Sequence, residues 1–123
     1  MRGYTETLTR RAALIGGLER FFDDWDALLC PVAAVPAIEH CPGGTPVPVD
    51  GAPVAYMMAI AAHCMPFNAT GHPAVVIPLT RSSEGLPIGL QIVGRRWAEP
   101  ALLAVASRLA EVVGPWRPPP GYA

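Results

Sequence analysis

The sequence predicts an α/β fold in which two apolar strands lie between helices. Residues 74–77 and 88–93 are apolar runs without polar alternation, which is typical of strands covered on both faces. Turn residues, RSSEG, join them at 81–85. Residues 5–24 and 99–113 instead place apolar side chains at helical spacing. So few strands would leave at least one sheet edge unpaired, which proteins normally avoid.

The amino-terminal segment is predicted to form a helix over residues 5–24. Its apolar side chains fall close to helical spacing, at Leu8, Ile15, Leu18 and Phe22. Gly16-Gly17 weakens this helix by about 1 kcal/mol per residue relative to Ala. Residues 27–30 then read as a short buried strand, which Pro31 ends.

Residues 31–53 contain six prolines together with Gly43, Gly44 and Gly51. We expect no regular element at that density of proline and glycine. A stretch of this length without secondary structure is usually a functional or covering loop in a compact domain. The segment is therefore predicted to be a Pro-rich loop that lies across a larger body.

The remaining elements carry clear boundary signals. Residues 54–65 could form a short helix rich in Ala and Met, which we expect to end at Pro66. Glu99-Pro100 opens the last helix, since proline fits a first helical turn, and Gly114-Pro115 closes it. Residues 115–123 are predicted to be an extended, proline-rich tail.

The overall composition suits one domain of 123 residues. A hydrophobic content of 51% is generous for this length and indicates surface that something else covers. The net charge of −1 gives no sign of a nucleic-acid or acidic-membrane partner. Neither a membrane-spanning run nor a signal peptide is visible, so we expect a cytoplasmic location. Three cysteines cannot all pair, which argues against a disulfide scaffold.

Candidate nucleophiles are scarce, because the chain has three serines and no lysine. Ser82-Ser83 has no His or Lys in its segment, and a serine needs an adjacent base to become a nucleophile. The pair is better interpreted as part of a turn. We therefore expect no catalytic residue in this chain.

Two His-Cys pairs, His40-Cys41 and His63-Cys64, raise the question of a metal site. Structural zinc sites usually pair ligands about two to four residues apart, and adjacent residues do not easily bind one ion. Cys64 is better interpreted as a small apolar residue at a helix end. No glycine has the strand-turn-helix context of a phosphate-binding loop. We expect neither a metal nor a cofactor.

Residues 68–73, NATGHP, have the properties of a positioning turn. Asn68 and Thr70 can hydrogen-bond local backbone and hold the turn, and Gly71 permits a conformation or a close approach that is closed to other residues. Pro73 holds His72 extended.

Two residues of the second strand also indicate positioning. Gly89 predicts the close approach of a neighbouring group. Gln91, between Leu90 and Ile92, is predicted to be a buried amide that must find hydrogen-bond partners. With no nucleophile among them, these residues predict a wall beside a site rather than a reaction centre.

Two segments, FNATGHPAVVIPL and GLPIGLQIVGRRWAEPALLAVASRL, strongly resemble the carboxy-terminal part of the amidase signature family. The family has an N-x-x-G-x-P turn before a strand, then G-L-P-x-G-x-Q and a strand, and a helix opened near a Glu. WDALLCPVAAVPA is similar to the family's strand-and-proline segment. The resemblance covers roughly residues 5–113 in order. The matching positions are Asn68, Gly71, Pro73, Gly85, Leu86, Pro87, Gly89, Gln91 and Glu99.

The resemblance implies amide hydrolysis by a Ser–cis-Ser–Lys triad in a Gly/Ser-rich, amino-terminal part of the family's enzymes. This chain has no Lys and no such segment, so no position inherits those roles. We expect a fragment of the family's mixed β-sheet with flanking helices, inactive alone. The chain would come from a truncated or split gene, or would be completed by a partner chain carrying the amino-terminal catalytic part.

The resemblance also bears on the subfamily. Glutamine-using tRNA amidotransferases of this family carry an acidic residue about two helical turns before the Asn, where this chain has Ala59-Ile60-Ala61-Ala62. A general amidase acting on a less polar amide fits better. The alternative is a non-enzymatic interaction protein derived from an amidase, which would fold alone and bind through an exposed apolar face.

Overall fold

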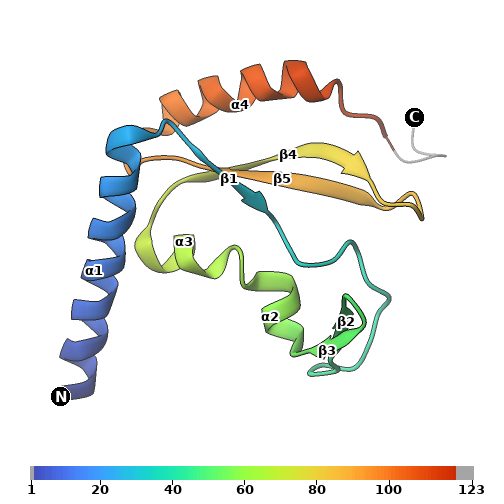
Figure 1. Cartoon of the computed structure of the whole chain (residues 1–123), viewed down its shortest axis with the longest axis horizontal. Helices are drawn as coiled ribbons and strands as arrows, with labels where there is room; N and C mark the ends of the chain where they lie inside the picture. The colour runs from blue at the N-terminus through green and yellow to red at the C-terminus, as the bar shows by residue number, and fades with distance from the viewer. Residues whose placement is uncertain (1, 119–123) are drawn as a thin grey trace.

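The structure is a computed structural model that describes residues 2–118. Helix α4 covers one face of a three-stranded sheet, α3 lies on the other side, and α1 crosses one end of the sheet (Figure 1). In chain order the elements are α1 (Arg2–Asp24), β1 (Leu28–Pro31), β2 (Val47–Val49), β3 (Ala52–Val54), α2 (Tyr56–Ala61), α3 (Met65–Thr70), β4 (Ala74–Arg81), β5 (Pro87–Val93) and α4 (Glu99–Val113). The predicted α/β class is confirmed.

Strand β5 is the centre of the sheet, which has the order β1-β5-β4. Both neighbours are antiparallel to β5, so Gln91 lies opposite Cys30 on one side and Val76 on the other. The β4–β5 register shifts between Pro78 and Thr80. Within residues 2–118 the outer edges of β1 and β4 pair with no further strand of this sheet, in agreement with the expected unpaired edge.

The apolar core has two parts, one on each face of the sheet. The residues buried under α4 are Ile77, Ile92, Leu102 and Ala106. Those buried on the opposite face, against α1 and α3, are Phe22, Phe67 and Val93. Full burial of one such side chain stabilises the fold by about 1.5–3 kcal/mol, so both helical layers hold the sheet.

Strand β4 departs from the prediction of a strand covered on both faces. Ile77 is 7% exposed and Val76 is 51% exposed. The reason is that α4 covers the face of Ile77, whereas α1 and α3 contact the other face near Val93, at the end of β5. The prediction of two-sided burial is therefore wrong for β4, whereas on β5 the successive residues Gln91, Ile92 and Val93 are all buried.

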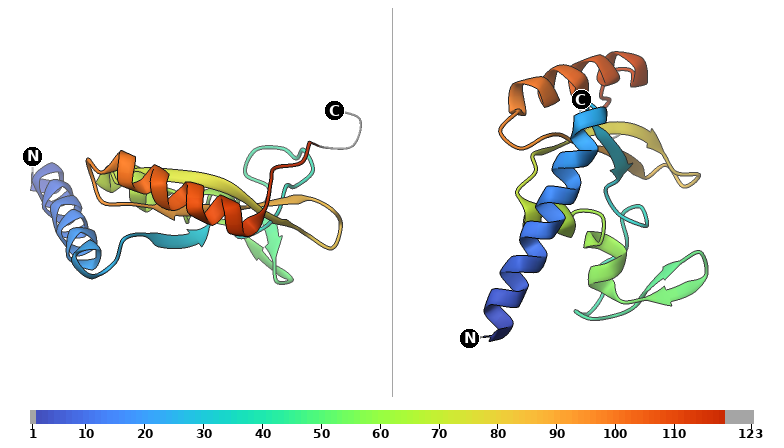
Figure 2. Two further views of the ribbon diagram at one scale, coloured as in Figure 1. Left: turned by 90° about the horizontal axis from the view of Figure 1, so that it is seen from above. Right: turned by 60° about the vertical axis from the view of Figure 1, so that its left-hand side comes forward.

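Helix α1 confirms the predicted amino-terminal helix, but only part of it contacts the body. Residues 3–14 are exposed, and the first buried side chain of the helix is Phe22. In Figure 2 the amino-terminal half of α1 extends away from the sheet. Among the described residues, this half makes one hydrogen bond to the body, from Arg11 Nε to the carbonyl oxygen of Ala69.

The expectation that residues 31–53 lack regular structure is wrong at their carboxy-terminal end. Strands β2 and β3 form an antiparallel hairpin, whose turn has positive φ at Asp50 (49°) and Gly51 (81°). These values fit a type I′ turn, for which Asp-Gly is a preferred pair. Residues 32–46 contain no helix or strand. Whether residues 31–53 lie over a larger body stays a prediction.

The helix expected over residues 54–65 is two short helices, and Pro66 does not end one. Helix α2 ends at Ala61, and Pro66 lies in the first turn of α3. Proline is accepted there because a first-turn N–H has no helical partner. Of the predicted extended tail, residues 115–118 form no helix or strand, and 119–123 lie outside the described residues. No helix within residues 2–118 is long and apolar enough to cross a membrane.

Candidate functional site

The seven residues predicted to form the structural motif divide between one turn and one hairpin. Asn68 is in α3, Gly71 follows this helix, and Pro73 precedes β4. The other members belong to the hairpin of β4 and β5: Gly85 lies in its turn and Pro87, Gly89 and Gln91 lie on β5.

Gln91 is the buried polar centre of this region, at 4% exposure. Its Nε2 donates a hydrogen bond to the carbonyl oxygen of His63 at 3.0 Å and lies 3.1 Å from Cys30 Sγ. Cys64 Sγ donates to the nearby carbonyl oxygen of Val32 at 3.2 Å. As expected, the buried amide finds partners. It thereby ties β5 to β1 and to the segment between α2 and α3.

Gly89 lies where two side chains approach the backbone of β5. A Cβ atom at this position would lie 2.9 Å from Val76 Cγ1 and 3.2 Å from Val32 Cγ2. Real Cβ atoms essentially never show the first distance. The close approach predicted for this glycine is therefore present, and it comes from both β4 and the segment after β1.

The turn after α3 depends on Gly71 and Thr70. Gly71 has φ 74°, and its N–H donates to the carbonyl oxygen of Phe67 at 2.8 Å. This left-handed conformation is one that glycine adopts without steric cost. Thr70 Oγ1 donates to the carbonyl oxygen of Pro66 at 2.9 Å.

The side chain of Asn68 does not make the hydrogen bond to local backbone that the sequence predicts. Its side chain is exposed and makes no hydrogen bond within residues 2–118. The expectation that Asn68 holds the turn is therefore wrong, since Thr70 makes the bond to local backbone. Asn68 leaves a free amide on the surface of α3.

His72 is a polar residue whose surroundings the sequence did not reveal. Its side chain is fully buried, with Nδ1 2.9 Å from Thr70 Oγ1 and Nε2 3.4 Å from Glu19 Oε1. Burial lowers the pKa of His72; the Glu19 carboxylate opposes this shift and the Arg96 guanidinium adds to it. No local sequence signal could have paired positions 19 and 72, because helix packing alone brings them together.

Ser82 serves the β4–β5 turn, as interpreted from the sequence. Its Oγ accepts hydrogen bonds from the backbone N–H groups of Glu84 and Leu86, at 3.3 and 3.2 Å. No base is hydrogen-bonded to Ser82 Oγ among the described residues. An unactivated hydroxyl of this kind is a poor nucleophile.

The two His-Cys pairs lie in different settings. His40 and Cys41 are exposed, while His63 and Cys64 are half-buried. Nowhere in residues 2–118 do three or more His, Cys, Asp or Glu side chains come together in a way that could hold a metal ion.

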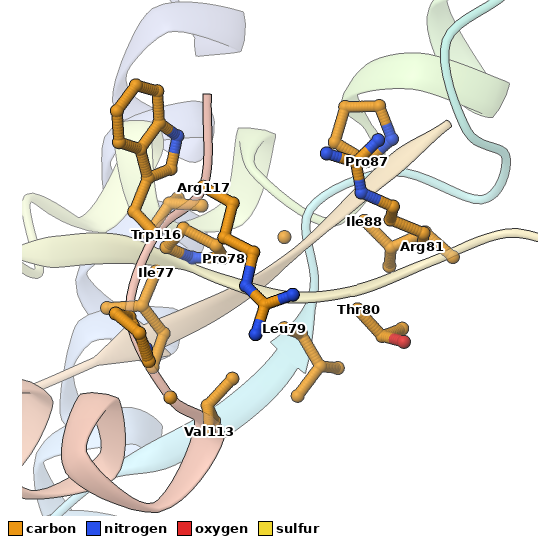
Figure 3. Close-up of a pocket in the computed structure, with 14 residues that line it drawn as sticks. Ile77, Pro78, Leu79, Thr80, Arg81, Pro87, Ile88, Val113, Trp116 and Arg117 are labelled. Carbon is orange, nitrogen blue, oxygen red and sulfur yellow. The ribbon is translucent and has the colours of Figure 1, made fainter. Parts of the chain in front are cut away.

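Two hollows flank the β4–β5 hairpin. One, of about 710 Å³, opens between the hairpin and the segment after α4 (Figure 3). Arg117 extends its guanidinium over β4 in this hollow, whereas Arg81 donates a hydrogen bond to the carbonyl oxygen of Gly85 at 3.1 Å. Among the described residues that line it, the charged side chains are Arg81 and Arg117, and none is a histidine or a carboxylate.

The second hollow has about 440 Å³ and lies between residues 31–37 and the hairpin. Every residue that lines it is apolar or glycine, and Val76 and Gly89 belong to the lining. Gly89 keeps the floor of this hollow open because any side chain there would enter the space of Val76 and Val32. Of the seven motif residues, Pro87 and Gly89 line this hollow, and Gln91 lies buried two positions further along β5.

Comparison with known proteins shows which family this chain belongs to. The family model described as Amidase matches residues 2–103. The chain belongs to the amidase family. The 6-aminohexanoate-cyclic-dimer hydrolase of Paenarthrobacter ureafaciens is 34% identical over 107 residues, which are 82% of this chain and 22% of that protein. The fatty acid amide hydrolase of Medicago truncatula is 35% identical over 98 residues, which are 76% of this chain and 15% of that protein.

Solved amidase structures share the fold of this chain. A crystal structure of an amidase matches with a TM-score of 0.82 at 28% identity, over 92% of this chain and 25% of that one. A glutamyl-tRNA(Gln) amidotransferase subunit from Thermotoga maritima matches with a TM-score of 0.70 at 28% identity, over 94% of this chain and 23% of that one. This member of the amidase family therefore spans about a quarter or less of the relatives that it matches.

Proposed function

We propose that this chain is the carboxy-terminal section of an amide-hydrolysing enzyme, in which it supplies sheet strands and one wall of the substrate pocket. The observation that carries the proposal is that residues 2–103 match the amidase model although the chain contains no lysine. The Ser–cis-Ser–Lys triad expected for the family then lies outside these 123 residues, in a section that completes the domain. By itself the chain is inactive.

The exposed apolar surface supports a role within a larger domain. Val76 on the sheet, Leu103 on α4 and Leu14 on α1 are each more than half exposed, at 51%, 57% and 57%. Exposed apolar groups on several faces indicate surfaces that another body covers. The completing section, carried on the same polypeptide or on a partner chain, would bury them.

The wall favours an uncharged, apolar substrate amide. The 440 Å³ hollow has only apolar and glycine lining, and the segment 59–62 before α3 carries no carboxylate. A pocket without a charged group does not stabilise an ionic substrate. A general amidase therefore fits better than a glutamine-using amidotransferase.

An activity assay tests the first part of the proposal. The purified chain is mixed with 4-nitroacetanilide, an anilide whose hydrolysis releases a coloured product. We expect no release above the rate without protein. Hydrolysis by the isolated chain that is abolished by Ser82→Ala would contradict the proposal, because it would place the nucleophile within the β4–β5 turn.

The genomic DNA upstream of codon 1, and the neighbouring genes, test the second part. A reading frame with a Gly/Ser-rich, lysine-containing segment would supply the completing section, and co-expression with it should produce amide hydrolysis. Without such a frame, a non-enzymatic interaction protein derived from an amidase becomes the better explanation. A cooperative thermal transition of the isolated monomer would also favour that alternative, since the chain would then need no partner to fold.

A further inference from the structure

The position of one hydrogen atom on His72 follows from its neighbour Thr70. Thr70 Oγ1 lies 2.9 Å from the carbonyl oxygen of Pro66 and 2.9 Å from His72 Nδ1. Thr70 Oγ1 donates its single hydroxyl hydrogen to the carbonyl oxygen of Pro66. Thr70 must then accept from His72, which places the hydrogen of the neutral imidazole on Nδ1.

The other ring nitrogen of His72 is consequently a bare acceptor in a buried place. The side chain is fully buried, and Nε2 has no hydrogen-bond partner among the described residues. Glu19 Oε1 lies 3.4 Å from it and is an oxygen that also only accepts. The ring of Phe22 lies 5.5 Å away on the same helix. Such a nitrogen gains a partner only when it takes up a proton.

The charges that face His72 balance when the ring is neutral. Glu19 and Asp23 come from α1, Arg95 and Arg96 come from the segment after β5, and α3 contributes the uncharged Thr70. Glu19 is already shared, since its Oε2 lies 3.6 Å from Arg95 Nη1. A proton on His72 places a positive charge on a fully buried side chain next to Arg96, and Glu19, which also faces Arg95, offsets this only in part.

We propose that His72 is an acid-sensitive latch that holds α1 against the turn between α3 and β4. Neutral His72 packs under Glu19 and Phe22, and its protonation releases α1. Undocking relieves the charge by giving the imidazolium access to water. Helix α1 is the element that can leave, because its residues 3–14 are exposed and its ion pair from Asp23 to Arg95 lies at the surface.

The direction of the pH effect follows from the two environments. The pKa of His72 is lower in the docked state than in the undocked state, where it takes the ordinary value of about 6.5. The full contribution of His72 to docking is present above that ordinary value. This contribution is lost as the pH falls from the ordinary pKa of histidine toward the pKa of the docked state. The latch does not depend on the proposed enzymatic role, so either can fail without the other.

Hydrogen exchange of the full 123-residue chain tests the latch. Protection of the amides of residues 15–22 is measured between about pH 8 and pH 5, in the wild type and in His72→Asn. Asparagine keeps a donor for Thr70 but does not titrate. Relative to this variant, wild-type protection should fall by up to about tenfold per pH unit below the ordinary histidine pKa, since one proton is taken up. His63→Asn, at a half-buried histidine outside the latch, should behave as the wild type.

The variant Glu19→Gln sharpens this test. It removes the only carboxylate that raises the pKa of His72, so the loss of protection between neutral and acid pH should become larger than in the wild type. The same loss in wild type and His72→Asn would overturn the proposal.

Nitrogen NMR of the wild-type imidazole tests the latch without any variant. At about pH 8, where the ring is neutral, the hydrogen should reside on Nδ1. Acidification should then change the His72 nitrogen signals and the α1 amide signals with one shared midpoint. A hydrogen on Nε2 at high pH, or α1 amides that stay constant while the ring titrates, would overturn the latch even if His72→Asn fails to fold.

Discussion

Gln91 Nε2 donates a hydrogen bond to the carbonyl oxygen of His63, 3.0 Å away, and so joins the central strand to the segment between α2 and α3. The two residues are 28 positions apart. The same segment contacts the apolar hollow, since Cys64 Sγ donates to the carbonyl oxygen of its lining residue Val32 at 3.2 Å. The bond is therefore a direct target for testing how the wall is built.

Replacing Gln91 by leucine should destabilise the chain. The variant Gln91→Leu keeps the side-chain size but leaves the His63 carbonyl without its donor, which should lower the free energy of unfolding by about 1–3 kcal/mol. Urea unfolding measures the change. Ser107→Ala, at an exposed hydroxyl on α4, is the control and should change stability by no more than about 0.5 kcal/mol. Equal values for the two variants would show that the Gln91 bond contributes nothing.

Gly89→Ala should destabilise through a steric clash. The new Cβ atom would lie 2.9 Å from Val76 Cγ1, and such overpacking typically lowers stability by about 1–3 kcal/mol. Gly17→Ala is the matched control: Gly17 lies within α1, and a Cβ added there would meet no atom within 4 Å, so alanine should raise stability by up to about 1 kcal/mol. Thermal unfolding compares the two.

The double variant of Gly89→Ala with Val76→Ala separates the clash from any effect of backbone conformation. Removing the Val76 methyl groups should recover part of the loss, so the two changes should not be additive. Full additivity would place the cause elsewhere in β5.

Gly71→Ala should destabilise through its backbone conformation. Gly71 has φ 74°, and its Cβ position is 3.8 Å from the nearest atom, Arg96 Nε, so the cause is not a clash. A non-glycine residue in the left-handed region costs about 1–2 kcal/mol. Chemical denaturation provides the measurement, with Gly43→Ala as the control because Gly43 lacks a positive φ and has open space. A neutral Gly71→Ala would mean that the turn adjusts.

The ion pair of Arg95 and Asp23 should contribute little despite its 2.7 Å separation. The side chains are 42% and 65% exposed, and exposed pairs contribute about 0–1 kcal/mol. Asp23→Asn should therefore lower the free energy of unfolding by less than about 1 kcal/mol. The difference from the wild type should vanish in about 1 M NaCl, where screening acts within a few ångströms. A larger, salt-independent loss would identify the pair as part of the core.

Local patterns predicted most of the elements correctly. The helical spacing of residues 5–24 corresponds to α1, and the apolar runs at 74–77 and 88–93 fall within β4 and β5. The β2–β3 hairpin had a readable signal in Asp50-Gly51, which the density of prolines around it obscured. The sequence predicts a helix end at Pro66, whereas Pro66 opens α3, because proline is common at both boundaries.

By itself, the sequence determined the α/β class, the need for a glycine at position 71 and the need of Gln91 for partners, because spacing, turn chemistry and side-chain polarity are local properties. Only the tertiary structure decided that those partners are His63 and Cys30, 28 and 61 residues away. It also decided that Glu19 faces a buried His72. Such pairings depend on which distant segments meet when helices pack on the sheet, and no short sequence window contains both partners.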